Sequence, residues 1–147
     1  MKNLLVLALF LIPLSCFAPY LPNDAERDIK AQEAYYNAKL RHDLVWAVGW
    51  VESRHRPYEY LERTKAAGLL QICPIMIEDL VSRGHNFTLA DRFDSAKSVE
   101  MFWIVQKQYT PNMNISAIVR KWGAGAGRMY CKGANRYYRE VMKKLHR

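Results

Sequence analysis

Proline and glycine divide this chain into short segments, and the segments between them have helical patterns. Pro57 and Pro111 each discourage continuation of a helix, Pro74 suits the first turn of one, and Gly84 suits the end of one. We find no alternating strand pattern longer than four residues and no internal repeat. A chain of 147 residues can form one domain with a core, but not two ordinary ones. The sequence therefore predicts a single all-α domain.

Capping residues indicate where several of these helices begin. Asn23 or Asp24 can cap the first helix, and Asp94 can cap the segment that follows it. The segment 58–68 has no clear period and is predicted to be irregular, and the run "GAGAG" is predicted to be a loop. The expected helices cover approximately residues 25–41, 43–53, 74–83, 95–109, 115–122 and 135–146.

The first eighteen residues are typical of an export signal. Lys2 precedes an apolar run from Leu4 to Leu14, which is the length of a signal-peptide core and short for a membrane span. Cleavage after Ala18 is one outcome. The other is a lipoprotein signal, in which Cys16 becomes the lipidated first residue and attaches the protein to a membrane. Either way we expect an exported protein of the periplasm or cell envelope, with residues 1–18 as the signal and 19–147 as its domain.

Positive charge is concentrated at the end of the chain. The formal net charge is +8, and residues 120–147 hold nine Lys or Arg against one acid, Glu140. Such a segment suits an anionic partner such as an envelope polymer, phospholipid headgroups or nucleic acid, although a solvated helix face is the plainer interpretation. Specific nucleic-acid binding ranks last, because aromatic residues are interleaved with these cations only at "RYYR".

The cysteines and histidines give no metal-site pattern. His42, His55, His85 and His146 are scattered without paired spacing to the cysteines. Cys73 and Cys131 remain as a pair once Cys16 is removed or lipidated, so they form either a disulfide in an oxidising compartment or two separate thiols. We expect no metal and no cofactor.

Glu52 is the strongest single candidate for chemistry. It ends the apolar run "VWAVGWVE", so its carboxyl is expected at the last turn of a helix beside an apolar surface. Desolvation raises the pKa of a carboxyl, and the negative end of the helix dipole acts in the same direction. Arg54 and Arg56 would oppose that rise if they faced it. A carboxyl of this kind can donate a proton near neutral pH.

Four short motifs occur in an order that resembles the lytic transglycosylase family, whose catalytic domain is goose-lysozyme-like. They are "ESRHRP", "AAGLLQICP", "WGAGAGR" and "RYYREVM", and the resemblance spans approximately residues 43–142. The resemblance implies a lysozyme-like fold with little β-structure. It also implies a general acid at Glu52, followed by Ser53, which in the family steadies the substrate or the acid.

The remaining motifs imply residues that line the glycan-binding cleft. Leu70 and Gln71 match the family's Gly-Leu-Met-Gln turn, with leucine in place of methionine. Trp122 and Ala124 match an aromatic and a small residue of the family's Ala-Tyr-Asn-Ala-Gly loop. Gly123 stands where the family has asparagine, which removes a polar side chain.

A late tyrosine completes the resemblance. In the family its hydroxyl approaches the catalytic carboxyl, and Tyr137 takes that position here, with the adjacent Tyr138 as a competitor.

The activity implied is cleavage of the β-1,4 bond between N-acetylmuramic acid and N-acetylglucosamine in peptidoglycan strands, with formation of a 1,6-anhydro ring. A hydrolytic muramidase of the same fold is an alternative, and it would need a base such as Glu59, Glu62 or Asp79. A non-catalytic glycan-binding or assembly protein is another, suggested by Gly123. A partner in the envelope or in a secretion apparatus is compatible with each alternative.

Overall fold

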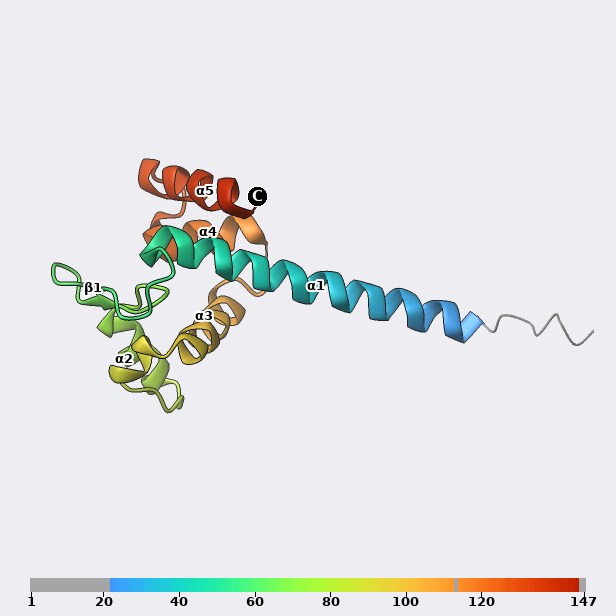
Figure 1. Ribbon diagram of the computed structural model, residues 1–147, viewed down its shortest axis with the longest axis horizontal. Helices are drawn as coiled ribbons and strands as arrows, with labels where there is room; N and C mark the ends of the chain where they lie inside the picture. Colours follow the sequence, from blue (N-terminus) through green and yellow to red (C-terminus); the bar gives the residue numbers. More distant parts are fainter. Residues whose placement is uncertain (1–21, 113, 146–147) are drawn as a thin grey trace, which may run out of the picture. The chain divides into compact units, whose positions relative to one another are not determined.

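The computed structural model describes residues 22–112 and 114–145 (Figure 1). The predicted signal segment 1–18, with its boundary and Cys16, lies outside the described residues. The chain divides into two units, 1–37 and 38–147, and the description below concerns the second unit except where helix α1 enters the first.

Helix α1 is continuous from Pro22–Ser53, where the sequence predicted two helices. No proline or glycine occurs between residues 23 and 48, so nothing in the chain ends the first helix before the second begins. The prediction of a break before Asp43 was therefore wrong. The consequence for the site is that Glu52 lies in the last turn of a long, regular helix.

A small hairpin and a short helix follow α1. Strand β1 (Tyr60–Leu61) pairs antiparallel with β2 (Ala66–Ala67), within the segment that we predicted to be irregular. Helix α2 (Pro74–Ser82) starts at a proline and is followed by Gly84, which has a φ of 87°. Both ends agree with the sequence prediction, because proline suits a first helical turn and glycine suits a left-handed end.

The second half of the chain is helical. A short 3₁₀ turn, η2 (Ala90–Phe93), leads into α3 (Ser95–Tyr109), which Asp94 caps by accepting hydrogen bonds from two backbone N–H groups. Helix α4 (Ile115–Ala124) and the turn η3 (Ala126–Arg128) lead to α5 (Lys132–Leu145), which packs against α4 (Figure 1). Helix α4 includes Gly123 and α5 starts at Lys132, so the glycine-rich loop is shorter than predicted.

One apolar core joins all five helices of the described chain. Fully buried side chains come from the end of α1, from the loop before α2, and from α2 to α5. The core includes Leu44, Val45, Val48, Leu70, Ile72, Ile77, Leu80, Met101, Phe102, Ile118, Val119 and Val141. The predicted all-α fold class is confirmed, with the hairpin as the sheet of the described residues. Within that part of the chain, no helix combines the length and the apolar character that crossing a membrane requires.

Gly68 directly follows strand β2 and lies close to the backbone of the turn η2. Its φ is 81°, and a Cβ atom there would lie 1.7 Å from the carbonyl oxygen of Arg92. The buried Arg92 guanidinium in turn donates hydrogen bonds to the carbonyl oxygens of Lys65, at 2.7 Å, and Ile72, at 3.2 Å. Arg92 therefore ties down the segment that carries Gln71.

We predict that Gly68→Ala lowers the free energy of unfolding by about 3 kcal/mol, because it adds a steric clash with Arg92 to left-handed backbone strain. Gly84→Ala is the matched control. Its φ of 87° is similar, but a Cβ atom there meets nothing within 4 Å, so strain alone costs about 1 kcal/mol. Urea unfolding of both variants measures the difference, and equal losses would contradict the contact with Arg92.

Candidate active site

Glu52 meets a tyrosine from the far end of the sequence. The hydroxyl of Tyr137, on α5, donates a hydrogen bond of 2.5 Å to Oε1 of Glu52, in the last turn of α1. Glu52 is half-buried, and Tyr137 is partly buried against the core. The structure thus brings together two residues that the resemblance places in one site.

Burial changes the proton affinity of Glu52. Desolvation raises the pKa of its carboxyl from 4.5 to about 7, although hydrogen bonds from Tyr137 and then Trp122 act in the opposite direction. Burial, and next the charge of Glu52, hold the pKa of Tyr137 well above 10, so its hydroxyl remains a donor. At neutral pH the carboxyl is therefore present in both protonated and ionised forms.

The structure explains why glycine is acceptable at position 123. A Cβ atom on Gly123 would lie 2.4 Å from ring carbons of Tyr137, so the tyrosine ring occupies the space that a side chain would need. Trp122, the preceding residue, packs on Phe102 with ring centroids 4.7 Å apart. The end of α4 therefore provides a surface without a side chain, against which the Tyr137 ring packs.

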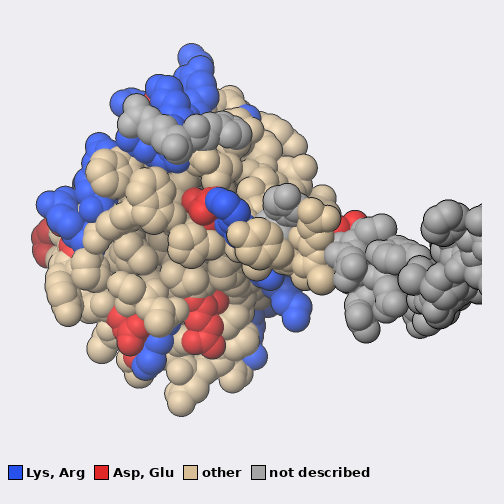
Figure 2. Space-filling view, turned by 45° about the vertical axis from the view of Figure 1, so that its right-hand side comes forward, with Lys and Arg blue, Asp and Glu red and all other residues tan. Residues whose placement is uncertain are grey.

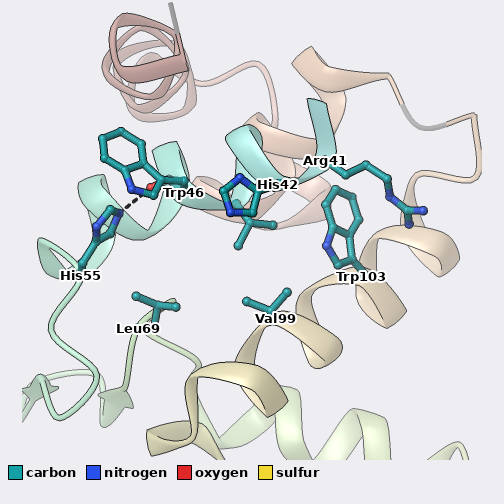
Figure 3. A pocket seen from close by; sticks show the side chains of 8 residues that line it. Arg41, His42, Trp46, His55, Leu69, Val99 and Trp103 are labelled. Atoms are coloured by element: carbon teal, nitrogen blue, oxygen red, sulfur yellow. Dashed lines mark hydrogen bonds between the residues drawn. The ribbon is translucent and has the colours of Figure 1, made fainter. Parts of the chain in front are cut away.

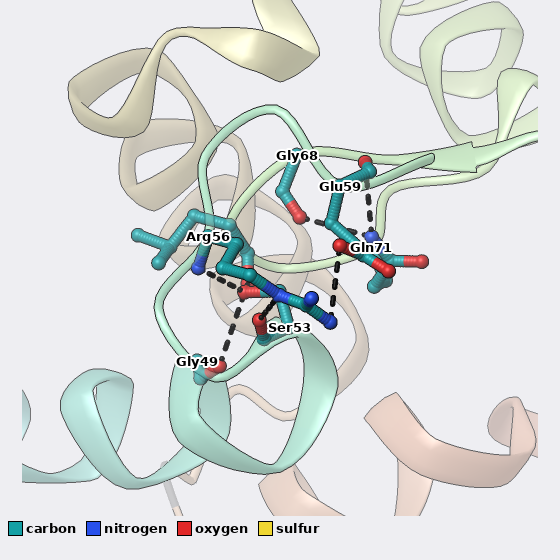
Figure 4. Close-up of polar contacts among 7 residues, drawn as sticks. Gly49, Ser53, Arg56, Glu59, Gly68 and Gln71 are labelled. Carbon is teal, nitrogen blue, oxygen red and sulfur yellow. Dashed lines mark hydrogen bonds and ion pairs between the residues drawn. The ribbon is translucent and has the colours of Figure 1, made fainter. Parts of the chain in front are cut away.

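Ser53 points into the protein. Only 1% of its surface is exposed, and its hydroxyl donates to the carbonyl oxygens of Leu69, at 2.8 Å, and Gly49, at 3.3 Å (Figure 4). It also accepts a hydrogen bond of 3.2 Å from the backbone N–H of Arg56. These bonds fasten the end of α1 to the loop before α2. Direct contact between Ser53 and a substrate stays a prediction.

Gln71 and Leu70 differ in their surroundings. Gln71 has a left-handed backbone, with a φ of 51°, and its amide nitrogen donates to the carbonyl oxygens of Glu59 and Gly68 (Figure 4). Its half-buried side chain is thereby held in one orientation. Leu70 is completely buried in the core, so the structure places it away from any surface that a sugar could reach. The leucine in this motif contributes packing.

Ala124, the other small residue predicted in the site, lies at the end of α4. It is half-buried and lines a hollow together with Gly123 and Tyr137. Tyr138, the competitor of Tyr137, has its ring beneath the guanidinium of Arg120 at 4.5 Å.

Cys73 lies near the site, although no motif in the sequence implies a catalytic role for it. It occupies the cap position before Pro74, and burial, then the charge of Glu52, raise the pKa of its thiol. Its position two residues after Gln71 is the signal in the sequence that could have placed it here. Cys73 and Cys131 are separate free thiols, so of the two alternatives the structure has the unpaired one.

A second hollow, of about 280 Å³, lies between the end of α1 and α3 (Figure 3). Trp46 and His55 line one part of it, and His55 Nε2 lies 2.7 Å from the carbonyl oxygen of Trp46. Arg41 lies over the ring of Trp103 at 4.4 Å in another part. Glu52 does not line this hollow, although His55 and Leu69, which do, belong to two of the sequence motifs.

The acids named as alternative bases each have a cationic partner. Glu59 pairs with Arg56 at 3.1 Å, and Glu62 pairs with Lys65. Asp79 pairs with Arg83 at 2.9 Å, and a hydrogen bond from that arginine is the main cause that lowers the pKa of Asp79. Among the residues that the structure describes, no group of three or more His, Cys, Asp or Glu could hold a metal ion.

A comparison with protein families identifies the family to which this chain is similar. The family described as the transglycosylase SLT domain matches residues 29–141, which is more than half of the chain. The chain belongs to the transglycosylase SLT family. No significant match was found among curated proteins or solved structures. The matched range of the SLT domain includes Glu52, Gln71, Trp122, Ala124 and Tyr137.

We predict that the SLT domain loses stability as the pH rises through the range 4.5 to 7. In that range Glu52 keeps its proton in the folded state but loses it in the unfolded state, so folding takes up a proton. The contribution is about 1.4 kcal/mol per pH unit. Glu52→Gln lacks this titration. The free energy gap, defined as the unfolding free energy of the variant minus that of the wild type, should therefore become more positive from pH 5 to pH 8. A gap that does not change in urea unfolding would contradict the raised pKa.

We also predict that Tyr137→Phe raises the pKa of Glu52 further, because it removes a hydrogen bond that favours the ionised carboxylate and keeps the ring that excludes water. Carboxyl ¹³C NMR titration measures this, with Glu52→Gln identifying the resonance. Tyr138→Phe is the control, because that ring lies beneath Arg120. An unchanged or lowered pKa in Tyr137→Phe would be contrary to the expectation.

Proposed function

We propose that this SLT domain is a peptidoglycan lytic transglycosylase, which cleaves the β-1,4 bond between N-acetylmuramic acid and N-acetylglucosamine. The observation that carries the proposal is one desolvated carboxyl, Glu52, with a pKa of about 7 and a tyrosine hydroxyl bonded to it. Membership of the transglycosylase SLT family supports the reaction class.

Glu52 acts twice in this mechanism. As a general acid it gives its proton to the glycosidic oxygen as the bond from that oxygen to C1 of the muramic acid breaks. As a general base it then takes the proton of the C6 hydroxyl, while that oxygen bonds to C1 and closes the 1,6-anhydro ring. A carboxyl with a pKa near 7 suits both steps, since neither protonation state is costly at neutral pH. Tyr137 orients the carboxyl throughout.

The internal C6 hydroxyl explains how one carboxylate is sufficient. Glycosidases that add water commonly use two carboxyl groups on either side of the bond. The carboxylates of Glu59, Glu62 and Asp79 all lie in ion pairs with neighbouring cations. This arrangement favours the transglycosylase over the hydrolytic muramidase.

The substrate contacts in this proposal come from Gln71, Trp122 and Ala124. Two hydrogen bonds from its side-chain amide hold Gln71 in place, and the side chain is half-buried, so it can present a polar edge to a sugar. Trp122 offers an aromatic surface beside the carboxyl. Ser53 and Leu70 act indirectly, by holding the end of α1 and the Gln71 turn in place.

We place this activity in the periplasm or cell envelope, because peptidoglycan is there and the sequence begins with an export-like segment. Attachment through a lipidated Cys16 is compatible with that location. Lysines and arginines gather at the top of Figure 2, at the height of α5 in Figure 1. Helix α5 also carries the exposed Lys132 and Lys143. Positive charge of this kind suits anionic envelope material or an acidic partner in a secretion apparatus.

The test is mass spectrometry of soluble products from purified peptidoglycan, with wild type and Glu52→Gln in parallel. We expect anhydromuropeptides from the wild type and at least a 100-fold lower yield from Glu52→Gln, because general acid–base catalysis is lost. Glu59→Gln is the matched control and should retain activity. Products with reducing ends would indicate a hydrolase, and no product from the wild type would favour the glycan-binding alternative.

A further inference from the structure

A hollow of about 460 Å³ opens beside the tyrosine that holds Glu52. We call it the arginine hollow, and define it by Gly123, Ala124, Arg128, Arg136 and Tyr137, which all line it. The arginines come from the turn η3 and from the first half of α5, and the small residues come from the end of α4. None of the four sequence motifs assigns a ligand to these arginines.

The hollow adjoins the candidate active site through Tyr137. Tyr137 lines the hollow and bonds Glu52 through its hydroxyl, and Val51, the residue before Glu52, also lines the hollow. A substituent on a sugar bound at Glu52 would therefore lie close to the hollow, on the other side of the Tyr137 ring. The Tyr137 ring fills the space above Gly123, and the small Ala124 lines the hollow next to it.

Charge decides what kind of group would bind. Arg128 and Arg136 are exposed, and neither takes part in an ion pair among the described residues. The acid of the hollow, Glu140, is paired with Lys143 at 3.0 Å, and the hydrogen bond from this lysine is the main cause that lowers its pKa. The charge of Arg136 also acts on Glu140, but among the described residues no ion pair or side-chain hydrogen bond holds either guanidinium. Both can therefore turn to a ligand, and guanidinium binds carboxylates with two parallel hydrogen bonds.

We propose that the arginine hollow binds a carboxylate carried by the substituent on the muramic acid. This inference rests on the proposed function and names the part of the substrate that the domain selects. Two sources have this chemistry: an acidic residue of an attached stem peptide, or the free lactyl carboxylate of a strand without peptides. Because an attached peptide converts the lactyl carboxyl into a neutral amide, the two sources occur in different substrates.

The test measures dissociation constants on the Glu52→Gln background, where turnover is blocked. The probes are soluble glycan strands that carry stem peptides, and the same strands after an amidase has removed the peptides. Arg128→Gln, Arg136→Gln and the double substitution are compared with Arg139→Gln, an exposed arginine of α5 outside the hollow. Circular dichroism checks that each variant is folded.

We expect each single substitution in the hollow to weaken binding about ten-fold for one of the two probes, and Arg139→Gln to change it less than two-fold. Weakening confined to the peptide-bearing strands assigns a peptide carboxylate, and weakening confined to the stripped strands assigns the lactyl carboxylate. Equal weakening for both probes assigns both carboxylates to the hollow. No weakening for either probe, or the same loss in Arg139→Gln, overturns the proposal.

Product analysis separates this inference from the proposed function. If the wild type releases no anhydromuropeptides, the proposed function fails, whereas the dissociation constants still test the hollow. If the wild type is active on peptide-bearing strands and both arginine variants keep its KM and kcat there, a stem-peptide role is excluded. A higher KM with an unchanged kcat on those strands supports binding by the arginines.

Discussion

The hydrogen bond between Tyr137 and Glu52 is the constraint on which the site depends. It joins the last turn of α1 to α5, two helices separated by most of the domain's sequence. Everything between them has to fold for the bond to form. The hairpin, α2 and α3 build one part of the core, and α4 provides Gly123, without which the tyrosine ring has no space. The carboxyl is therefore desolvated only in the complete domain.

A desolvated carboxyl is costly, and the structure shows what offsets the cost. Above its pKa of about 7 the folded protein carries a charge in a site with little water. Ser53 and Arg92 hold the segment before α2 in place, because both are buried and both donate hydrogen bonds to backbone carbonyl groups of that segment. The apolar core makes the same segment rigid through Leu70 and Ile72. Stabilising contacts therefore surround Glu52, a residue that itself lowers the stability of the fold. Such an arrangement is common where activity needs a strained or poorly solvated residue.

The sequence could predict those features that depend on local chemistry. The limits of α2 and α3 agree with the prediction because Pro74, Gly84 and Asp94 act on their own backbone neighbours. The break predicted in α1 was wrong because polar residues at a helix surface do not end a helix. The hairpin was missed because strands of two residues are too short to show alternation. The resemblance identified Glu52 and Tyr137, but the sequence alone could not show that both face each other.

Other features of the site depend on contacts between distant residues, and no local pattern contains them. From the sequence, Gly123 is interpreted as the loss of a polar side chain. The structure shows that the Tyr137 ring occupies the space that a side chain at position 123 would need. Leu70 appeared to be a cleft residue because it is part of a motif, whereas its side chain is in the core. A motif therefore preserves a backbone shape as well as a set of contacts. In the Gln71 turn, the motif determines a left-handed backbone and two hydrogen bonds from the glutamine side chain. The buried leucine holds the turn in that conformation by packing in the core.

The position of Tyr137 also limits how the domain can recognise a substrate. Its ring lies against Gly123, its hydroxyl donates a hydrogen bond to Glu52, and its side chain lines the arginine hollow. A ligand that displaced the ring would therefore also disturb the carboxyl and change its pKa. In the proposed mechanism, a substrate that binds beside Tyr137 without moving it would keep the pKa of Glu52 near 7, where the carboxyl could both give and accept a proton. Under that proposal, substrate recognition in the arginine hollow and proton transfer at Glu52 would be coupled through the side chain of Tyr137.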